Sequence, residues 1–122
     1  MITKDFATQV AQAWIEAWNS HDLARVLSHY TDNFEMTTPF IARLMGEDRG
    51  TLVGKDSIGS YWSQALAQMP DLHFELIEVL FSVNSICIYY KSVLGLRAVE
   101  WLYFDNAGTV CKASAHYNES VI

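Results

Sequence analysis

The chain has 122 residues, of which 51% are hydrophobic, and a formal net charge of −6 at pH 7. This length fits one domain with one core, which we place at residues 1–122, and the hydrophobic content excludes a disordered chain. The acidic balance argues against nucleic acid and against anionic membranes as partners, because both bind to basic surfaces.

Nothing in the sequence directs the chain to a membrane or an oxidising compartment. The first ten residues, "MITKDFATQV", lack the apolar stretch of a signal peptide, and no apolar run reaches the ~20 residues of a membrane span. Cys87 and Cys111 stand far apart and outside any Cys-x-x-Cys pattern, so we expect reduced, buried thiols, with a cross-strand disulfide as the minor alternative. We expect a cytoplasmic protein.

The first part of the chain carries helical periodicity in three segments. The first helix is capped by Thr3, and its apolar residues recur at helical spacing: Phe6, Val10, Trp14, Ala17 and Trp18. A second, shorter helix begins near Asp22 and carries Tyr30 on its apolar side. A third helix covers residues 55–69 and ends at Pro70.

Between the second and third helices we expect a short strand, "NFEMTTPF", closed by Pro39, because proline lacks a backbone donor. Residues 41–54 hold mixed charges and three glycines, and they are interpreted as a loop with a little strand.

After Pro70 the pattern changes to β-branched and aromatic residues separated by turn signals. Four strands are predicted, at residues 72–83, 85–95, 96–105 and 109–118. Three helices followed by antiparallel strands indicate an α+β fold, in which a strongly curled sheet wraps the helices and leaves an apolar hollow between the layers.

One strand carries an acidic residue on its apolar side. Every second residue from Leu96 to Phe104 is apolar except Glu100. Burying a lone carboxylate is costly, so such a group is usually paired, protonated or directed into a cavity. We expect Glu100 to face inward with a raised pKa, and the alternative is a buried acid satisfied by its neighbours with no ligand.

The last predicted strand gives a second alternation, and the histidines give no metal motif. Cys111, Ala113, Ala115 and Tyr117 share the inward side, so Lys112 and His116 are expected to face outward. The four histidines form no H-x-H or H-E-x-x-H arrangement, and no phosphate-binding loop or nucleophile motif is present. We therefore expect no metal and no cofactor.

Several stretches together resemble the nuclear transport factor 2-like superfamily, which includes the ketosteroid isomerases and the SnoaL-type polyketide cyclases. They are "AWNSHDLARVLSHYTDNFEMTTP", "GKDSIGSYWSQAL", "YFDNAGTV" and "ASAHY", and the likeness runs from about Phe6 to Tyr117. The resemblance implies a cone of curved antiparallel sheet around helices, an apolar pocket inside it, and a homodimer formed through the outer face of the sheet.

The resemblance also implies site residues, but two of the three that ketosteroid isomerases use differ here. Thr38 stands where those enzymes place their acidic base, and a threonine hydroxyl holds its proton too tightly to replace it. Trp14 stands at the position of their helix tyrosine, and Glu100 at the position of their second carboxylic acid. Steroid isomerisation itself is therefore not expected.

The sequence leaves two functions open. The first is a SnoaL-like pocket protein for an apolar ligand with a carbonyl or hydroxyl group, in which Glu100 is catalytic and the chemistry is isomerisation, cyclisation or dehydration. Its ligand-binding residues would be Trp14, Tyr30, Thr38 and Trp62. The alternative is a non-catalytic dimeric module that binds a ligand or a protein.

Overall fold

The structure is a computed structural model that describes residues 1–46 and 48–121. The described residues form four α-helices, six strands and one 3-10 helix. The helices are α1 (Lys4–Ser20), α2 (Leu23–Leu27), α3 (Pro39–Met45) and α4 (Lys55–Gln68), with the 3-10 helix η1 (Val93–Gly95). The strands are β1 (Tyr30–Thr37), β2 (Thr51–Val53), β3 (Glu75–Phe81), β4 (Ser85–Lys91), β5 (Arg97–Phe104) and β6 (Val110–Tyr117).

The strands form one curved sheet in the order β2-β1-β6-β5-β4-β3. All neighbouring strands are antiparallel except β1 and β6, which run parallel, so the sheet is mixed rather than wholly antiparallel. Register shifts interrupt three of the pairings and add local bends to the twist of the sheet. The predicted α+β class with a curved sheet is confirmed.

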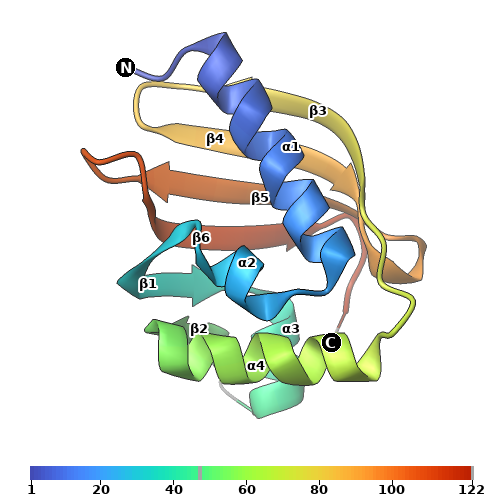
Figure 1. Cartoon of the computed structure of the whole chain (residues 1–122). Coiled ribbons are helices and arrows are strands. Elements are labelled where there is room, and N and C mark those ends of the chain that lie inside the picture. Colours follow the sequence, from blue (N-terminus) through green and yellow to red (C-terminus); the bar gives the residue numbers. More distant parts are fainter. Residues whose placement is uncertain (47, 122) are drawn as a thin grey trace.

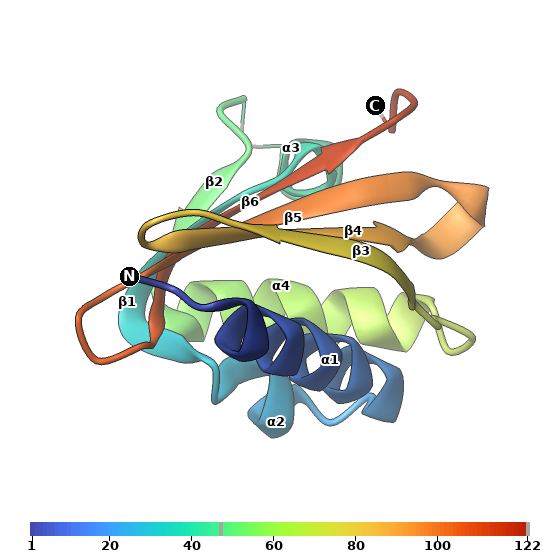
Figure 2. The ribbon, with the colours of Figure 1, turned by 90° about the horizontal axis from the view of Figure 1, so that it is seen from above.

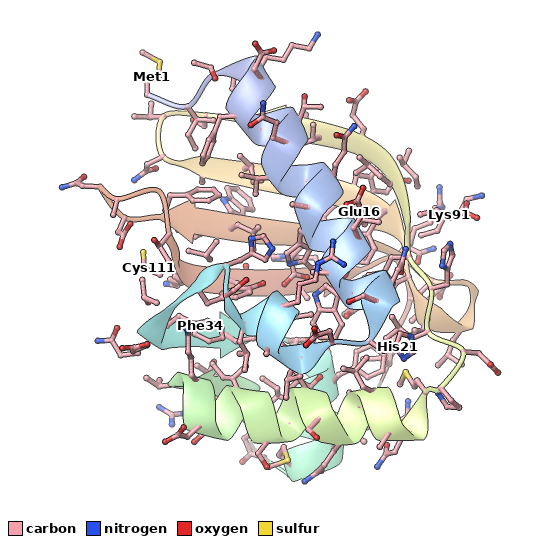
Figure 3. The ribbon with its side chains drawn as sticks, viewed as in Figure 1. Met1, Glu16, His21, Phe34, Lys91 and Cys111 are labelled. Atoms are coloured by element: carbon pink, nitrogen blue, oxygen red, sulfur yellow. The ribbon has the colours of Figure 1, made fainter. Side chains whose placement is uncertain are left out.

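Helices cover one face of this sheet. Figures 1 and 2 show α1, α2 and α4 on the same side of the strands, with α1 crossing above β4 and β5. Side chains fill the layer between helices and sheet, where Phe34 of β1 is fully buried (Figure 3). Within the two described ranges, no helix combines the length and the apolar character needed to cross a bilayer.

The segment after β1 differs from the sequence prediction. Residues 39–45 form α3 instead of a loop, because Thr38 caps the helix and Pro39 occupies its first turn, where a missing N–H is harmless. The described residues therefore contain four α-helices, where the sequence predicted three. The short strand expected within residues 41–54 is confirmed as β2, and position 47 of that segment lies outside the described residues. Tyr30 opens β1 and is not part of the second helix.

The predicted placement of the thiols is wrong. Cys111 is exposed and Cys87 is half-buried, and both are free cysteines. In the β5–β6 pairing, Tyr103 lies opposite Lys112 and Phe104 opposite Val110, so Cys111 is the extra residue of a bulge. The bulge breaks the alternation of β6 at that residue, while Ala113 and Ala115 point inward as predicted.

Candidate functional site

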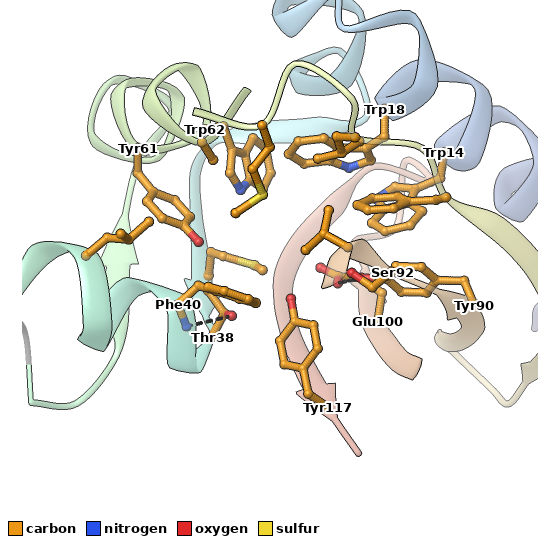
Figure 4. Close-up of a pocket in the computed structure, with 17 residues that line it drawn as sticks. Trp14, Trp18, Thr38, Phe40, Tyr61, Trp62, Tyr90, Ser92, Glu100 and Tyr117 are labelled. Atoms are coloured by element: carbon orange, nitrogen blue, oxygen red, sulfur yellow. Dashed lines mark hydrogen bonds between the residues drawn. The ribbon is translucent and has the colours of Figure 1, made fainter. Parts of the chain in front are cut away.

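A cavity of about 70 Å³ lies between the helices and the concave face of the sheet. Aromatic and aliphatic side chains form most of its wall (Figure 4). Its lining residues are Trp14, Trp18, Met36, Thr38, Phe40, Leu44, Tyr61, Trp62, Ala65, Met69, Leu72, Phe74, Tyr90, Ser92, Val93, Glu100 and Tyr117. The lining residues that are not fully buried are Leu44, Ala65, Met69, Val93 and Tyr117.

Glu100 provides the one carboxyl group among the described residues that line this cavity. It lies on β5 between Ile88 of β4 and Ala115 of β6, and it is only 3% exposed. Burial raises its pKa from 4.5 to about 8, and the hydrogen bond that the Tyr90 hydroxyl donates to Oε1, at 3.3 Å, opposes the increase. The acid is therefore predominantly protonated at neutral pH.

Three tyrosines that line the cavity remain protonated. Burial raises the pKa of Tyr61, Tyr90 and Tyr117 above its ordinary value, and the charge of an ionised Glu100 raises it further. None of these hydroxyls can act as a base near neutral pH, and the one proton of the Tyr90 hydroxyl is already donated to Glu100. The hydroxyls of Tyr61 and Tyr117 are neutral groups that can hydrogen-bond to a ligand. The cavity therefore combines one weak acid with several neutral donors.

The structure brings four of the five predicted site residues to this cavity. Trp14, Thr38, Trp62 and Glu100 all line it, whereas Tyr30 is not among the lining residues. The Trp14 indole N–H donates a hydrogen bond of 2.9 Å to the Tyr30 hydroxyl, so it is not available to a ligand. Trp14 offers only its ring surface, and Tyr30 positions that ring.

The Thr38 hydroxyl already has a structural role. Its oxygen accepts a hydrogen bond of 3.3 Å from the Phe40 backbone N–H and so caps α3. Its backbone N–H donates to the carbonyl of Gly50 at 2.9 Å, which joins β1 to the segment before β2. Thr38 shapes one wall of the cavity and supplies no basic group.

Trp18 was not among the predicted ligand-binding residues, yet the nitrogen of its indole ring lacks the hydrogen bond that a buried polar atom normally makes. Its indole Nε1 is buried and has no hydrogen-bond partner in the described part of the chain. Buried polar groups are normally paired, so this unpaired donor in a cavity wall requires an explanation.

Sequence reasoning also missed Tyr61, Tyr90 and Tyr117 as site residues. Tyr61 lies on the buried face of α4, and Tyr117 lies on the predicted inward side of β6. Tyr90 follows the buried residues Ile86 and Ile88 at alternate positions of β4. The same alternation that indicated Glu100 could therefore have placed Tyr90 and Tyr117 at the site, and helical spacing could have placed Tyr61 there.

The family of the chain is shown by comparison with known proteins. The SnoaL-like domain family matches residues 11–100, and the chain belongs to this family within the nuclear transport factor 2-like fold. A SnoaL-like protein of unknown function from Burkholderia thailandensis E264 is 47% identical, with a TM-score of 0.94 over 97% of this chain and 98% of that chain.

Two more distant structures support the fold alone. A nuclear transport factor 2-like protein of unknown function from Cytophaga hutchinsonii ATCC 33406 is 12% identical, with a TM-score of 0.71 over 97% of this chain and 92% of that chain. A SnoaL-like family protein from Agrobacterium tumefaciens str. C58, proposed to be an isomerase, is 15% identical, with a TM-score of 0.74 over 94% of this chain and 99% of that chain. No curated protein matches the chain.

Proposed function

We propose that the protein binds a mostly apolar molecule with a carbonyl or hydroxyl oxygen, and that Glu100 transfers protons to and from it. The observation that carries this proposal is a 3% exposed carboxyl group, with a pKa of about 8, in the wall of an aromatic cavity. A perturbed acid in a cleft is typical of a functional site. The proposed isomerase activity of one structural neighbour belongs to the same class of reaction.

A single carboxyl group can balance such a reaction by acting first as an acid and then as a base. In keto-enol isomerisation, protonated Glu100 gives its proton to the carbonyl oxygen, and the resulting carboxylate takes a proton from the adjacent carbon. In dehydration, the proton goes to the leaving hydroxyl, and the carboxylate again takes a proton from carbon. In both cases Glu100 ends the cycle protonated.

Hydrogen exchange in D₂O tests this proposal without knowledge of the natural substrate. Cyclohexanone is the probe, and proton NMR measures the loss of the signal from its α-hydrogens. We expect the wild-type protein to accelerate exchange over buffer, and Glu100→Gln to remove that acceleration. Glu119→Gln, at an exposed position, is the control and should behave as wild type. Equal rates for wild type and Glu100→Gln would overturn the catalytic role.

A non-catalytic binding module is the second candidate, and one observation favours it. The position of the usual base is Thr38, whose hydroxyl caps α3 and carries no basicity. In that case cyclohexanone binds without any acceleration of exchange.

We also propose that two copies of the chain pair through the outer face of the sheet. The outward residues of β5 include Trp101, which is 38% exposed and stacks on Tyr103 with ring centroids 5.8 Å apart. We define the outer patch as Cys87, Tyr89, Val99, Trp101, Tyr103 and Ser114. Exposed aromatic residues of this kind are enriched in protein interfaces.

A further inference from the structure

The indole N–H of Trp18 is buried and unsatisfied. Trp18 is 6% exposed, and its Nε1 finds no acceptor among the residues that the structure describes. The neighbouring Trp14 differs, because its N–H donates to the Tyr30 hydroxyl at 2.9 Å. A buried donor without an acceptor lowers stability, so a ligand that supplies one would gain affinity at this atom.

The packing of Trp18 holds this N–H at the cavity. Its ring contacts Trp14 and Trp62 edge to face, with centroids 6.2 and 5.1 Å away, and lies at 5.8 Å from Phe74. The indole is therefore enclosed by aromatic rings, which offer its N–H no oxygen acceptor. Figure 4 shows Trp18 above the cavity with its nitrogen directed inward, while the Glu100 carboxyl group lies on the side of the sheet.

The volume of the cavity limits the ligand. A cavity needs about 10–15 Å³, measured in the same way, to hold one water molecule, so 70 Å³ has room for roughly five to seven. Pockets for drug-sized ligands measure about 300–1,000 Å³. The described lining residues include no lysine, arginine or histidine, so the wall offers neutral donors and no cation for an anionic ligand.

We infer that the ligand is a neutral carbonyl compound of one ring or a short chain, with a second acceptor oxygen that receives the Trp18 N–H. This inference rests on the proposed function and adds the size and the acceptor pattern of the substrate. Trp18 would act as a specificity-determining residue, because a ligand without the second oxygen leaves its donor unpaired.

Two matched probes test the acceptor pattern. Tetrahydropyran-4-one and cyclohexanone each have seven non-hydrogen atoms and differ in one group, an ether oxygen or a methylene opposite the carbonyl. Trp18→Phe removes the donor, so the ratio of their affinities should shift against tetrahydropyran-4-one by roughly tenfold relative to wild type. A ratio that is the same in both proteins would overturn the role of Trp18.

The indole signals of the wild-type protein give a second test that does not depend on a folded variant. In ¹H–¹⁵N spectra, tetrahydropyran-4-one should move the Trp18 indole proton downfield, and methylcyclohexane should not. The Trp14 N–H, bonded to Tyr30, and Trp101, on the outer face, are internal controls that should move little. An unmoved Trp18 signal at saturating probe would overturn the inference.

The outcomes separate this inference from the proposed function. Only the inference fails if Glu100→Gln abolishes exchange of cyclohexanone but the ratio of the two probe affinities is the same in wild type and Trp18→Phe. If a four-ring steroidal ketone binds and the single-ring probes do not, the predicted size is wrong. If cyclohexanone binds and exchanges at the rate of buffer while the Trp18 signal still responds to tetrahydropyran-4-one, the acceptor pattern is supported and the catalytic role is overturned.

Discussion

At Glu100, burial and hydrogen bonding act on the pKa in opposite directions, and burial dominates. The Tyr90 hydroxyl favours the carboxylate, yet one hydrogen bond cannot replace the water that the group has lost. The result is an acid that holds its proton at neutral pH and can still release it. That property suits a group that donates to a carbonyl oxygen and afterwards takes a proton back.

The raised pKa of Glu100 predicts a specific dependence of stability on pH. Between pH 4.5 and about 8, the folded protein holds a proton that the unfolded chain has lost, so the free energy of unfolding falls as the pH rises through this window. Glu100 contributes a decrease of at most about 5 kcal/mol. Urea unfolding should show Glu100→Gln gaining stability over wild type from pH 5 to 9, with Glu119→Gln as the control. A constant difference between Glu100→Gln and wild type would contradict the raised pKa.

Removal of the Tyr90 hydroxyl should raise the pKa of Glu100 further, because the carboxylate loses the hydrogen bond that favours it. We expect an increase of about one unit in Tyr90→Phe, since a charge-assisted hydrogen bond contributes about 1.5–3 kcal/mol. A ¹³C NMR titration of the Glu100 carboxyl carbon measures it. Tyr61→Phe is the matched control, because the Tyr61 hydroxyl does not hydrogen-bond to Glu100 in the described structure. A lower or unchanged pKa in Tyr90→Phe would contradict the assignment.

Alternation alone placed Glu100 correctly on the inner side of its strand, because each residue of β5, from Arg97 to Phe104, follows the predicted parity. The Trp18 donor was not predictable in the same way. Helical spacing indicates that its ring is buried, but whether the N–H finds an acceptor depends on Trp62 of α4 and on Phe74, just before β3, which only the folded chain brings near. Packing between elements decides whether this N–H has an acceptor, and the periodicity of a single element carries no information about such packing.

At the scale of elements, the segment from β1 to β2 shows why one prediction was wrong. Proline ends a strand and also suits the first turn of a helix, so Pro39 is consistent with both structures. The preceding Thr38 distinguishes them, because a threonine before such a proline can cap the helix, as it does here. The resulting α3 provides Phe40 and Leu44 to the cavity wall.

Gly50 is expected to be essential for this arrangement. It adopts a φ of +64°, and an added Cβ would lie 2.9 Å from the carbonyl oxygen of Thr38. Gly46 has a similar φ of +66° but open space around it, so it is a matched control for backbone strain alone. We expect Gly46→Ala to cost about 1–2 kcal/mol and Gly50→Ala to cost at least about 1 kcal/mol more. Denaturant unfolding measures both, and equal losses would show that the close approach to Thr38 is unimportant.

At the scale of the molecule, the proposed dimer depends on the outer patch. Trp101→Lys places a charge at its centre, so we expect the dissociation constant of the dimer to rise at least tenfold. Light scattering over a range of protein concentrations measures this. Leu94→Lys, at a residue that is 75% exposed in η1 and is not part of the outer patch, is the control and should leave the dimer intact. A wild-type protein that is monomeric at micromolar concentration would overturn the dimer itself.

The parallel pairing of β1 with β6 affects how the protein is made. Met36 lies beside Ala113, so the two partners are separated by most of the chain, whereas β3, β4 and β5 pair with strands that are adjacent in sequence. During translation, β1 leaves the ribosome long before its partner exists, and closing so large a loop is entropically slow. The pairing beside Met36 is therefore completed last, and a nascent chain stalled before residue 110 leaves the hydrogen-bonding edge of β1 that faces β6 unpaired and open to chaperones.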